Sequence, residues 1–262
     1  MKKGNLLRKL ILIIALGVFA FSAYKLYLIY AEYKSINDEY DAIQDEVVIQ
    51  DSFEEVEDEQ DVEQEKEEPK FEVDFEKLLA INEEVIGWIR FDEPSIISYP
   101  IAQGKDNDKY LHTSVEGDYL MAGTIFVDYQ NDDDFRDENT VIYGHNMKNG
   151  SMFGKLRQFR DEEFCEQNPY FYIYTVDGRE IKYQIFAVKV VGDTSNAYDK
   201  IYVDKEEFQE YIDGIYKNTI CTIDGVNVTA EDRIVTLSTC VGVETERLVV
   251  YGVVVSESVS GE

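Results

Sequence analysis

Cysteine and histidine are scarce in this chain of 262 residues, which holds three cysteines and two histidines. Cys240 ends the expected strand RIVTLSTC, immediately before a loop that leads into a second strand, RLVVYGVVV. His145 follows another expected strand, NTVIY, after a single glycine. A thiolate that attacks a carbonyl needs a partner to protonate the leaving group, and histidine is the usual one. These positions indicate a cysteine nucleophile paired with a histidine acid/base.

Arg247 opens the strand that follows Cys240. In an antiparallel hairpin the last residue of one strand faces the first residues of its neighbour, so Cys240 and Arg247 are expected to meet at one end of a sheet. A cation lowers the pKa of a nearby thiol, and an arginine fork can also polarise a substrate carbonyl. Taken singly, a cysteine is commonly a small buried side chain. The three residues at strand ends together favour catalysis.

The other cysteines and the second histidine carry weaker signals. His112 lies in the polar loop KYLHTSVEG and is interpreted as an exposed loop residue. Cys165 and Cys221 have no nearby basic partner in the pattern, and an odd number of cysteines leaves at least one thiol unpaired. So few histidines and cysteines exclude most multi-ligand metal sites. The acidic run DDDF at 132–135 is interpreted as a solvated turn, so no metal site is expected.

The N-terminal segment predicts export of the remainder. Residues 1–9 carry four basic side chains and no acidic one, and residues 10–31 are mostly apolar. About 22 such residues suffice to cross a bilayer as a helix. Basic residues before the segment indicate a cytoplasmic N-terminus. We predict a cytoplasmic tip and a single-pass signal-anchor over 1–31, with the rest on the extracellular face. A cleaved secretory signal is the main alternative, and a buried soluble helix is a third.

Acidic residues dominate the segment that follows. Residues 32–70 are expected to form a flexible, self-repelling stalk, of which 31–50 can continue as a helix. An acidic tail that recruits a partner is the alternative. The whole chain has 54 acidic and 25 basic residues, a formal net charge of −29. Because nucleic-acid binding needs a basic face, the charge argues against a nucleic-acid partner.

Residues 71–262 have the composition of one compact domain. Helices are expected at 74–82, where an aspartate caps the first turn, and at 151–158 and 204–216. Short segments rich in β-branched and aromatic residues predict strands at 84–89, 95–102, 124–128, 140–143, 170–175, 180–191, 233–238 and 247–255. The strands do not alternate regularly with helices. This pattern predicts a mostly β fold, a closed antiparallel barrel with appended helices.

Several motifs, in this order along the chain, resemble the sortase family, and most of all its class B branch. They are INEEVIGWI (81–89), YPIAQGKDNDKYL (99–111), GTIFVD (123–128), NTVIYGHNM (139–147) with GSMFGKL (150–156), TLSTC (236–240) and RLVVYG (247–252). The resemblance covers about residues 74–255, essentially the whole domain, and implies a sortase-type β-barrel. It also implies that Cys240 is the nucleophile, that His145 is the acid/base, and that Arg247 stabilises the oxyanion and holds the substrate.

The same resemblance implies a substrate groove and a reaction. Asn107, Leu111 and Tyr198 match positions of the groove that binds the sorting peptide. The implied enzyme is a membrane-anchored cysteine transpeptidase that needs no cofactor. It cleaves a C-terminal sorting motif of secreted proteins through a thioester and joins them to an amine of a peptidoglycan precursor or cross-bridge. A pilin-polymerising sortase and a non-enzymatic membrane-tethered adhesin or scaffold are the alternatives.

Overall fold

The computed structural model describes residues 2–50, 71–223, 225–240 and 245–259, and the side chains of 2–7, 50 and 240 lie outside that description. The chain divides into two compact units, Met1–Ile43 and Gln44–Glu262. The first unit consists of most of helix α1, which runs over Lys2–Val47. From Arg8 onward α1 is long and apolar enough to cross a membrane, with a mean hydropathy of 2.0 in its most apolar 18-residue window. This helix includes the segment for which a membrane anchor is predicted.

The second unit begins before residue 71, the domain start expected from composition. Strand β1 (Val48–Gln50) pairs antiparallel with β2 (Phe71–Val73), which ties residues 48–50 to the domain. Helix α2 (Phe75–Ile81) follows, and the Asp74 side chain caps it by accepting from the backbone N–H of Lys77. The capped helix predicted at 74–82 is therefore present. The connection between β1 and β2, residues 51–70, lies outside the described part of the chain, as does that much of the predicted stalk.

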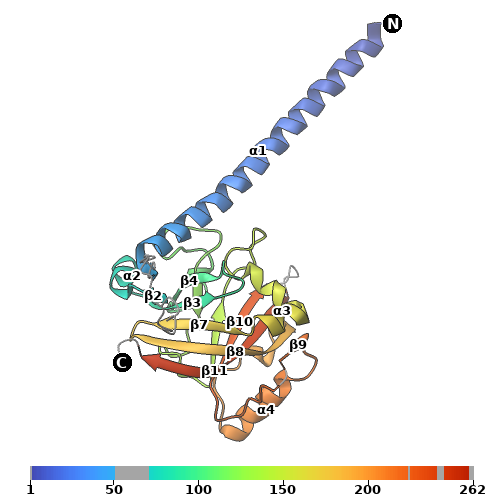
Figure 1. Ribbon diagram of the computed structural model, residues 1–262. Helices are drawn as coiled ribbons and strands as arrows, with labels where there is room; N and C mark the ends of the chain where they lie inside the picture. The colour runs from blue at the N-terminus through green and yellow to red at the C-terminus, as the bar shows by residue number, and fades with distance from the viewer. Residues whose placement is uncertain (1, 51–70, 224, 241–244, 260–262) are drawn as a thin grey trace, which may run out of the picture. The chain divides into compact units, whose positions relative to one another are not determined.

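Eight strands of the described chain close into a ring (Figure 1). Their order around the ring is β11, β10, β6, β5, β4, β3, β7 and β8, and a β8–β11 pairing completes it. The strands are β3 (Val85–Phe91), β4 (Ser98–Ala102), β5 (Ile125–Val127), β6 (Asn139–Tyr143), β7 (Tyr170–Thr175), β8 (Arg179–Gly192), β10 (Ile234–Cys240) and β11 (Glu246–Val259). The short β9 (Cys221–Thr222) adds to β8. The predicted closed β-barrel is confirmed.

Two neighbouring pairs in this barrel are parallel, which differs from a purely antiparallel arrangement. They are β4 with β5 and β6 with β10. Parallel neighbours require a long crossover connection, and β6 is separated from β10 by three strands and several helices. The consequence for function is direct. The carboxyl ends of β6 and β10, where His145 and Cys240 were predicted to act, lie at the same end of the sheet.

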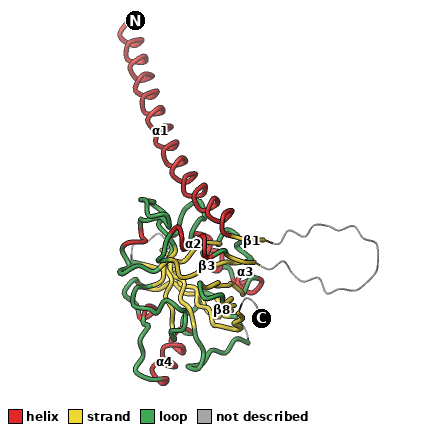
Figure 2. The backbone as a smooth tube through the Cα atoms, turned by 90° about the vertical axis from the view of Figure 1, so that its left-hand side faces the viewer, coloured by secondary structure: helices red, strands yellow, loops and turns green. Residues whose placement is uncertain are grey.

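Short helices cover the ends and flanks of the barrel (Figure 2). They are η1 (Lys109–Leu111), η2 (Gly154–Arg160), α3 (Glu162–Gln167), η3 (Asn196–Tyr198) and α4 (Lys205–Ile215). Asp204 caps α4 by accepting from the backbone N–H groups of Glu206 and Glu207. The apolar face predicted for this helix is buried, and it packs against residues of β8 and β11 such as Phe186 and Tyr251. Both figures show α2 and α4 at opposite ends of the barrel.

A stack of buried aromatic rings joins β3, β7 and β8. Phe171 stacks on Phe91 with a centroid distance of 4.8 Å and on Tyr183 with a distance of 5.1 Å. Gly252 of β11 is needed beside this stack, because a Cβ there would lie 2.8 Å from the Phe171 ring. Burying each such ring contributes about 1.5–3 kcal/mol of transfer free energy. The stack therefore holds β3, β7 and β8 together.

Candidate active site

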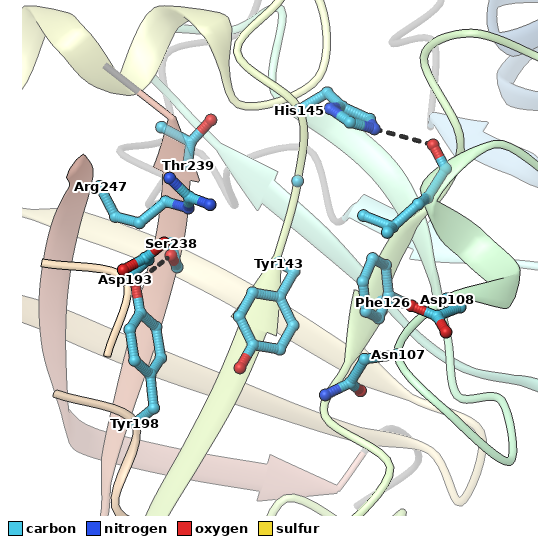
Figure 3. Close-up of a pocket in the computed structure, with 12 residues that line it drawn as sticks. Asn107, Asp108, Phe126, Tyr143, His145, Asp193, Tyr198, Ser238, Thr239 and Arg247 are labelled. Carbon is cyan, nitrogen blue, oxygen red and sulfur yellow. Dashed lines mark hydrogen bonds between the residues drawn. The ribbon is translucent and has the colours of Figure 1, made fainter. Parts of the chain in front are cut away.

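An open groove of about 390 Å³ lies at the carboxyl ends of β6 and β10 and the start of β11. Figure 3 shows Ser238, Thr239 and Arg247 on one side of the groove, Asn107 and Asp108 on the other, and Tyr143 between them. The lining residues are Asn107, Asp108, Leu111, Phe126, Tyr143, Gly144, His145, Asp193, Tyr198, Ser238, Thr239 and Arg247. Five of the six residues singled out from the sequence therefore line one cavity, and the sixth, Cys240, directly follows the lining residue Thr239.

The parallel pairing of β6 with β10 brings the carboxyl ends of these two strands together. Tyr143 is in register with Ser238, and the N–H of Gly144 donates to the carbonyl of Ser238 at 3.1 Å. His145 lies two residues beyond Tyr143, and Cys240 lies two residues beyond Ser238. The histidine therefore follows the end of β6, and the cysteine ends the neighbouring strand β10, at the same end of the sheet.

The antiparallel pairing of β10 with β11 brings Arg247 to the same place. Cys240 is directly opposite Arg247 in the register, as the hairpin argument predicted. The Arg247 side chain is half-buried and lines the groove, and its Nη1 donates to the carbonyl of Glu246 at 3.0 Å. A cation at this position favours the charged form of a thiol or an oxyanion nearby.

His145 is held by the wall of the groove. Its Nε2 lies 2.7 Å from the carbonyl oxygen of Leu111. A carbonyl only accepts, so Nε2 carries the proton and Nδ1 is the acceptor of the neutral ring. Burial lowers the pKa of His145, and the charge of His112 lowers it further, whereas the bond to Leu111 opposes both. The neutral imidazole is therefore the resting form at neutral pH, which suits a group that first accepts the thiol proton.

His112 is exposed, as predicted, but it also contacts the site. Its ring stacks on that of His145, with centroids 5.5 Å apart and an interplanar angle of 14°. Sequence reasoning did not connect the two histidines, because they are 33 positions apart. The contact depends on the path of η1, which carries Leu111 and then His112 past the end of β6.

Gly144 has a packing role between β6 and His145. A Cβ at this position would lie 2.5 Å from Cδ1 of Ile125 and 2.6 Å from Cδ2 of Phe153. Both distances are below those that real Cβ atoms tolerate, so a larger residue would displace the chain that carries His145. Close approach of these two side chains is therefore the physical reason for the glycine.

The three residues matched to a peptide groove lie together. Asn107 and Leu111 come from one wall, and Tyr198 comes from η3 on the other. The Tyr198 hydroxyl is 3.0 Å from Oγ of Ser238, which joins η3 to β10. Tyr143 lies between the two walls, with its ring 5.2 Å from that of Phe126 and 6.0 Å from that of Tyr198.

Tyr143 and Ser238 are site residues that sequence reasoning missed. A signal for them was present, because side chains at positions i and i+2 of a strand share a face. Tyr143 is two residues before His145, and Ser238 is two residues before Cys240. The other missed lining residues, Asp108, Phe126, Asp193 and Thr239, come from segments whose approach depends on the tertiary fold.

The two remaining cysteines lie in the interior. Cys165 in α3 and Cys221 in β9 are free thiols with 0% and 1% of their surfaces exposed. Burial raises the pKa of both thiols, and for Cys165 the contact with Cys221 raises it further. Neither residue lines the groove. Within the described ranges, no cluster of three or more histidine, cysteine, aspartate or glutamate side chains is arranged to hold a metal ion.

Comparisons with known proteins identify the family. The family model described as the sortase domain matches residues 93–255. Sortase B of Listeria monocytogenes is 32% identical over 260 residues, which is 98% of this chain and 100% of the relative. Sortase B of Staphylococcus aureus is 32% identical over 189 residues, covering 70% of this chain and 75% of the relative. The crystal structure of Bacillus anthracis sortase B in complex with AAEK1 superposes with a TM-score of 0.71 at 33% identity, covering 87% of this chain and 99% of that one. With its barrel, its groove and its sequence in agreement, the chain belongs to the sortase family, and its relatives are sortases of class B.

Proposed function

We propose that this sortase transpeptidase works through Cys240, His145 and Arg247, and that it joins secreted proteins to the cell wall. Its substrates are proteins with a C-terminal sorting motif, and its acceptor is an amine of a peptidoglycan precursor or cross-bridge. One observation carries the assignment of residues. Cys240 is directly opposite Arg247 across the β10–β11 pairing, and it ends the strand whose parallel neighbour, β6, ends two residues before His145.

The first half of the reaction forms a thioester. The proton of the Cys240 thiol passes to neutral His145, and the thiolate adds to the carbonyl carbon of a threonine in the sorting motif. As the carbon–nitrogen bond breaks, the imidazolium of His145 gives its proton to the departing amine. The amine leaves, and the threonine carbonyl remains bonded to the sulfur. Charge develops on the carbonyl oxygen between these steps, and Arg247 is the cation placed to stabilise it.

The second half transfers the acyl group. An amine of the cell-wall acceptor attacks the thioester carbonyl, and His145 takes the proton that the new amide must lose. The thiolate of Cys240 leaves and recovers a proton from His145. One amide bond is broken and one is formed, so the sequence is redox-neutral and needs no further reactant. Asn107, Leu111 and Tyr198 are proposed to hold the sorting peptide, since they line the walls of the same groove.

Sortases are enzymes of the cell envelope, and α1 is long and apolar enough to serve as a membrane anchor. We propose that the chain crosses the membrane once, with a cytoplasmic N-terminus and residues 32–262 on the extracellular face. The four basic residues before the apolar segment support this orientation. In this topology the groove meets proteins as they emerge from the membrane.

A product analysis tests the proposed function. The detergent-solubilised full-length chain is incubated with a library of threonine-containing peptides and with two amines, a peptidoglycan stem peptide and a pilin-derived lysine peptide. Mass spectrometry then identifies cleavage and ligation products. We expect cleavage after threonine and a new amide to the peptidoglycan amine. Ligation to the lysine peptide alone would support the pilin-polymerising alternative, and the absence of any cleavage would contradict the proposal.

A further inference from the structure

A buried carboxylate lies behind the groove, at the end of β5. Asp128 has 2% of its surface exposed and does not line the cavity itself. Its Oδ2 accepts from Nδ2 of Asn107 at 2.9 Å and from the hydroxyl of Tyr143 at 3.0 Å. Its Oδ1 accepts from the backbone N–H of Gln130 at 3.0 Å. One buried side chain therefore holds two groove residues that come from different parts of the sequence.

Lys200 supplies the opposite charge and a link to the other wall. Its Nζ lies 3.2 Å from Oδ2 of Asp128, and the two side chains are 11% and 3% exposed. The same Nζ donates to the carbonyl of Tyr198 at 3.1 Å. Burial alone would raise the pKa of Asp128, but the donors and the lysine charge together lower it, so the carboxylate is ionised. The pair thus connects the 107 loop, β6 and the segment after η3.

This network fixes which way the Asn107 amide points. A carboxylate only accepts, so the atom facing Asp128 must be Nδ2, and Oδ1 accepts from the backbone N–H of Tyr129 at 3.0 Å. The amide nitrogen has two protons and the amide oxygen has two lone pairs, of which the network uses one each. The remaining proton and lone pair suit the backbone of an extended peptide. Figure 3 shows the amide nitrogen of Asn107 on the side that faces Tyr143.

We propose that Asp128, neutralised by Lys200, is a positioning residue for substrate binding. It holds the Asn107 amide, the Tyr143 ring and the Tyr198 segment in the arrangement that accepts the sorting peptide. This inference rests on the proposed function of the groove. Asp128 and Lys200 thus have a role in peptide binding, and they take no part in breaking or forming covalent bonds.

A purely structural role explains less well why a charged side chain is buried at position 128. Removing two ions from water is costly, and well-packed apolar side chains of similar volume usually stabilise a fold as much or more. An apolar pair cannot accept hydrogen bonds from an amide and a hydroxyl at the same time. The ionised carboxylate can, with both donors on a single oxygen. Orientation of groove side chains therefore explains the charge.

Asp128→Asn tests the proposal, because it keeps the volume and removes the charge. The substrate is the peptide cleaved fastest by the wild-type full-length chain, chosen from the threonine-containing library. We expect KM to rise about 10- to 100-fold, the range for losing a hydrogen bond to a charged group. We expect kcat to change by less than about threefold, since no group that touches the reacting atoms is altered.

Two further variants separate positioning from folding. Asp128→Asn leaves Lys200 buried without its counter-charge, so the double variant with Lys200→Met should recover thermal stability but keep the raised KM. Asp137 provides a matched control, because its Oδ2 accepts from Nδ2 of Asn131 at 2.8 Å, outside the groove. Asp137→Asn should leave KM unchanged. Recovery of both stability and KM in the double variant, or an equal rise of KM in Asp137→Asn, would overturn the proposal.

A measurement without substrate keeps this inference distinct from the proposed function. The side-chain amide of Asn107, observed by NMR in the full-length chain in detergent, should have one proton protected from exchange by Asp128. That protection should be lost in Asp128→Asn and retained in Asp137→Asn. If the wild type cleaves no peptide, the proposed function fails. The exchange of the Asn107 amide protons would still show whether Asp128 positions that side chain. An Asn107 amide that is unchanged in Asp128→Asn would contradict it.

Discussion

The Nε2 atom of His145 donates a hydrogen bond to the carbonyl oxygen of Leu111, 2.7 Å away. In a catalytic triad, a third group commonly orients the base that activates the nucleophile. In the proposed mechanism, the carbonyl of Leu111 is the group that orients His145. The acceptor is a backbone carbonyl of the groove wall. A carbonyl dipole stabilises the imidazolium that forms during proton transfer, and hydrogen bonds to a charged donor are stronger than neutral ones. His145, the proposed base, is therefore positioned by the wall that is proposed to bind the peptide.

The stacked histidines make a prediction about protonation. The charge of His112 lowers the pKa of His145, so His112→Gln should raise it. Because the chain has only two histidines, NMR titration of the ring protons follows each one without ambiguity. A His145 pKa that stays the same or falls in the variant would contradict the assigned interaction.

The lowered pKa of His145 also predicts a pH dependence of stability. An unfolded histidine titrates near 6.5, and the folded value lies below it. As the pH falls through 6.5, the unfolded state binds the proton first, so this group reduces stability between pH 6.5 and its folded pKa. His145→Gln should remove that part of the decrease, measured as the change in melting temperature between pH 7 and pH 5. An identical loss in both proteins would exclude the contribution.

The three thiols should differ in reactivity. Cys165 and Cys221 are buried and their pKa values are raised, so they should resist an alkylating reagent in the folded protein. Cys240, at the groove, should react first, and the other two only after unfolding. Mass spectrometry of the native, alkylated full-length chain checks this order. Cys165→Ala and Cys221→Ala should retain peptide cleavage, and equal labelling of wild type and Cys240→Ala would refute the assignment of the reactive thiol.

Arg247 permits charge and geometry to be separated. If its guanidinium forms a fork with the carbonyl oxygen, Lys cannot replace it, because an ammonium keeps the charge and loses the planar pair of donors. Arg247→Lys should then lower kcat/KM by about 10²-fold or more, as for one lost oxyanion donor worth about 2.7–4 kcal/mol. Steady-state hydrolysis of the peptide, with thermal melts as the folding control, measures this. Near-wild-type rates in both Arg247→Lys and Arg247→Ala would remove the residue from the catalytic set.

Local patterns in the sequence predicted the elements of the fold well. The helix expected at 204–216 is present as α4, and the strands expected at 170–175 and 180–191 are present as the paired strands β7 and β8. Both depend on neighbours a few residues apart. The hairpin geometry likewise placed Cys240 opposite Arg247, because the pairing of consecutive strands follows from their order.

Local patterns could not predict the contacts between residues that lie far apart in the sequence. The parallel ladder of β6 and β10 joins segments about 95 positions apart, and it brings the end of β10 beside the end of β6, which His145 follows. Asp128 was read only as the last residue of a strand motif, since nothing nearby shows that Asn107, Tyr143 and Lys200 surround it. The stacking of His112 on His145 has the same origin. Such contacts are set by the closed barrel as a whole.

The proposed topology is tested on intact cells from which the wall has been removed. Protease added outside should cut the acidic region between the membrane segment and the barrel and release a domain-sized fragment. The cytoplasmic tip should remain with the membrane. A control protein of the cytosol must stay uncut in the same samples. Recovery of the whole chain from the cytosol, or its protection inside intact cells, would refute the topology.

If Cys240 is the nucleophile, it forms a thioester with the cleaved substrate. Intact-mass spectrometry detects this intermediate when the full-length chain in detergent is mixed with the best-cleaved peptide and quenched in acid. We expect an adduct equal to the N-terminal acyl fragment less one hydrogen. It should map to Cys240, be absent from Cys240→Ala, and disappear as ligation product forms when the peptidoglycan amine is added. An adduct on another residue, or undiminished cleavage by Cys240→Ala, would show that Cys240 is not the nucleophile.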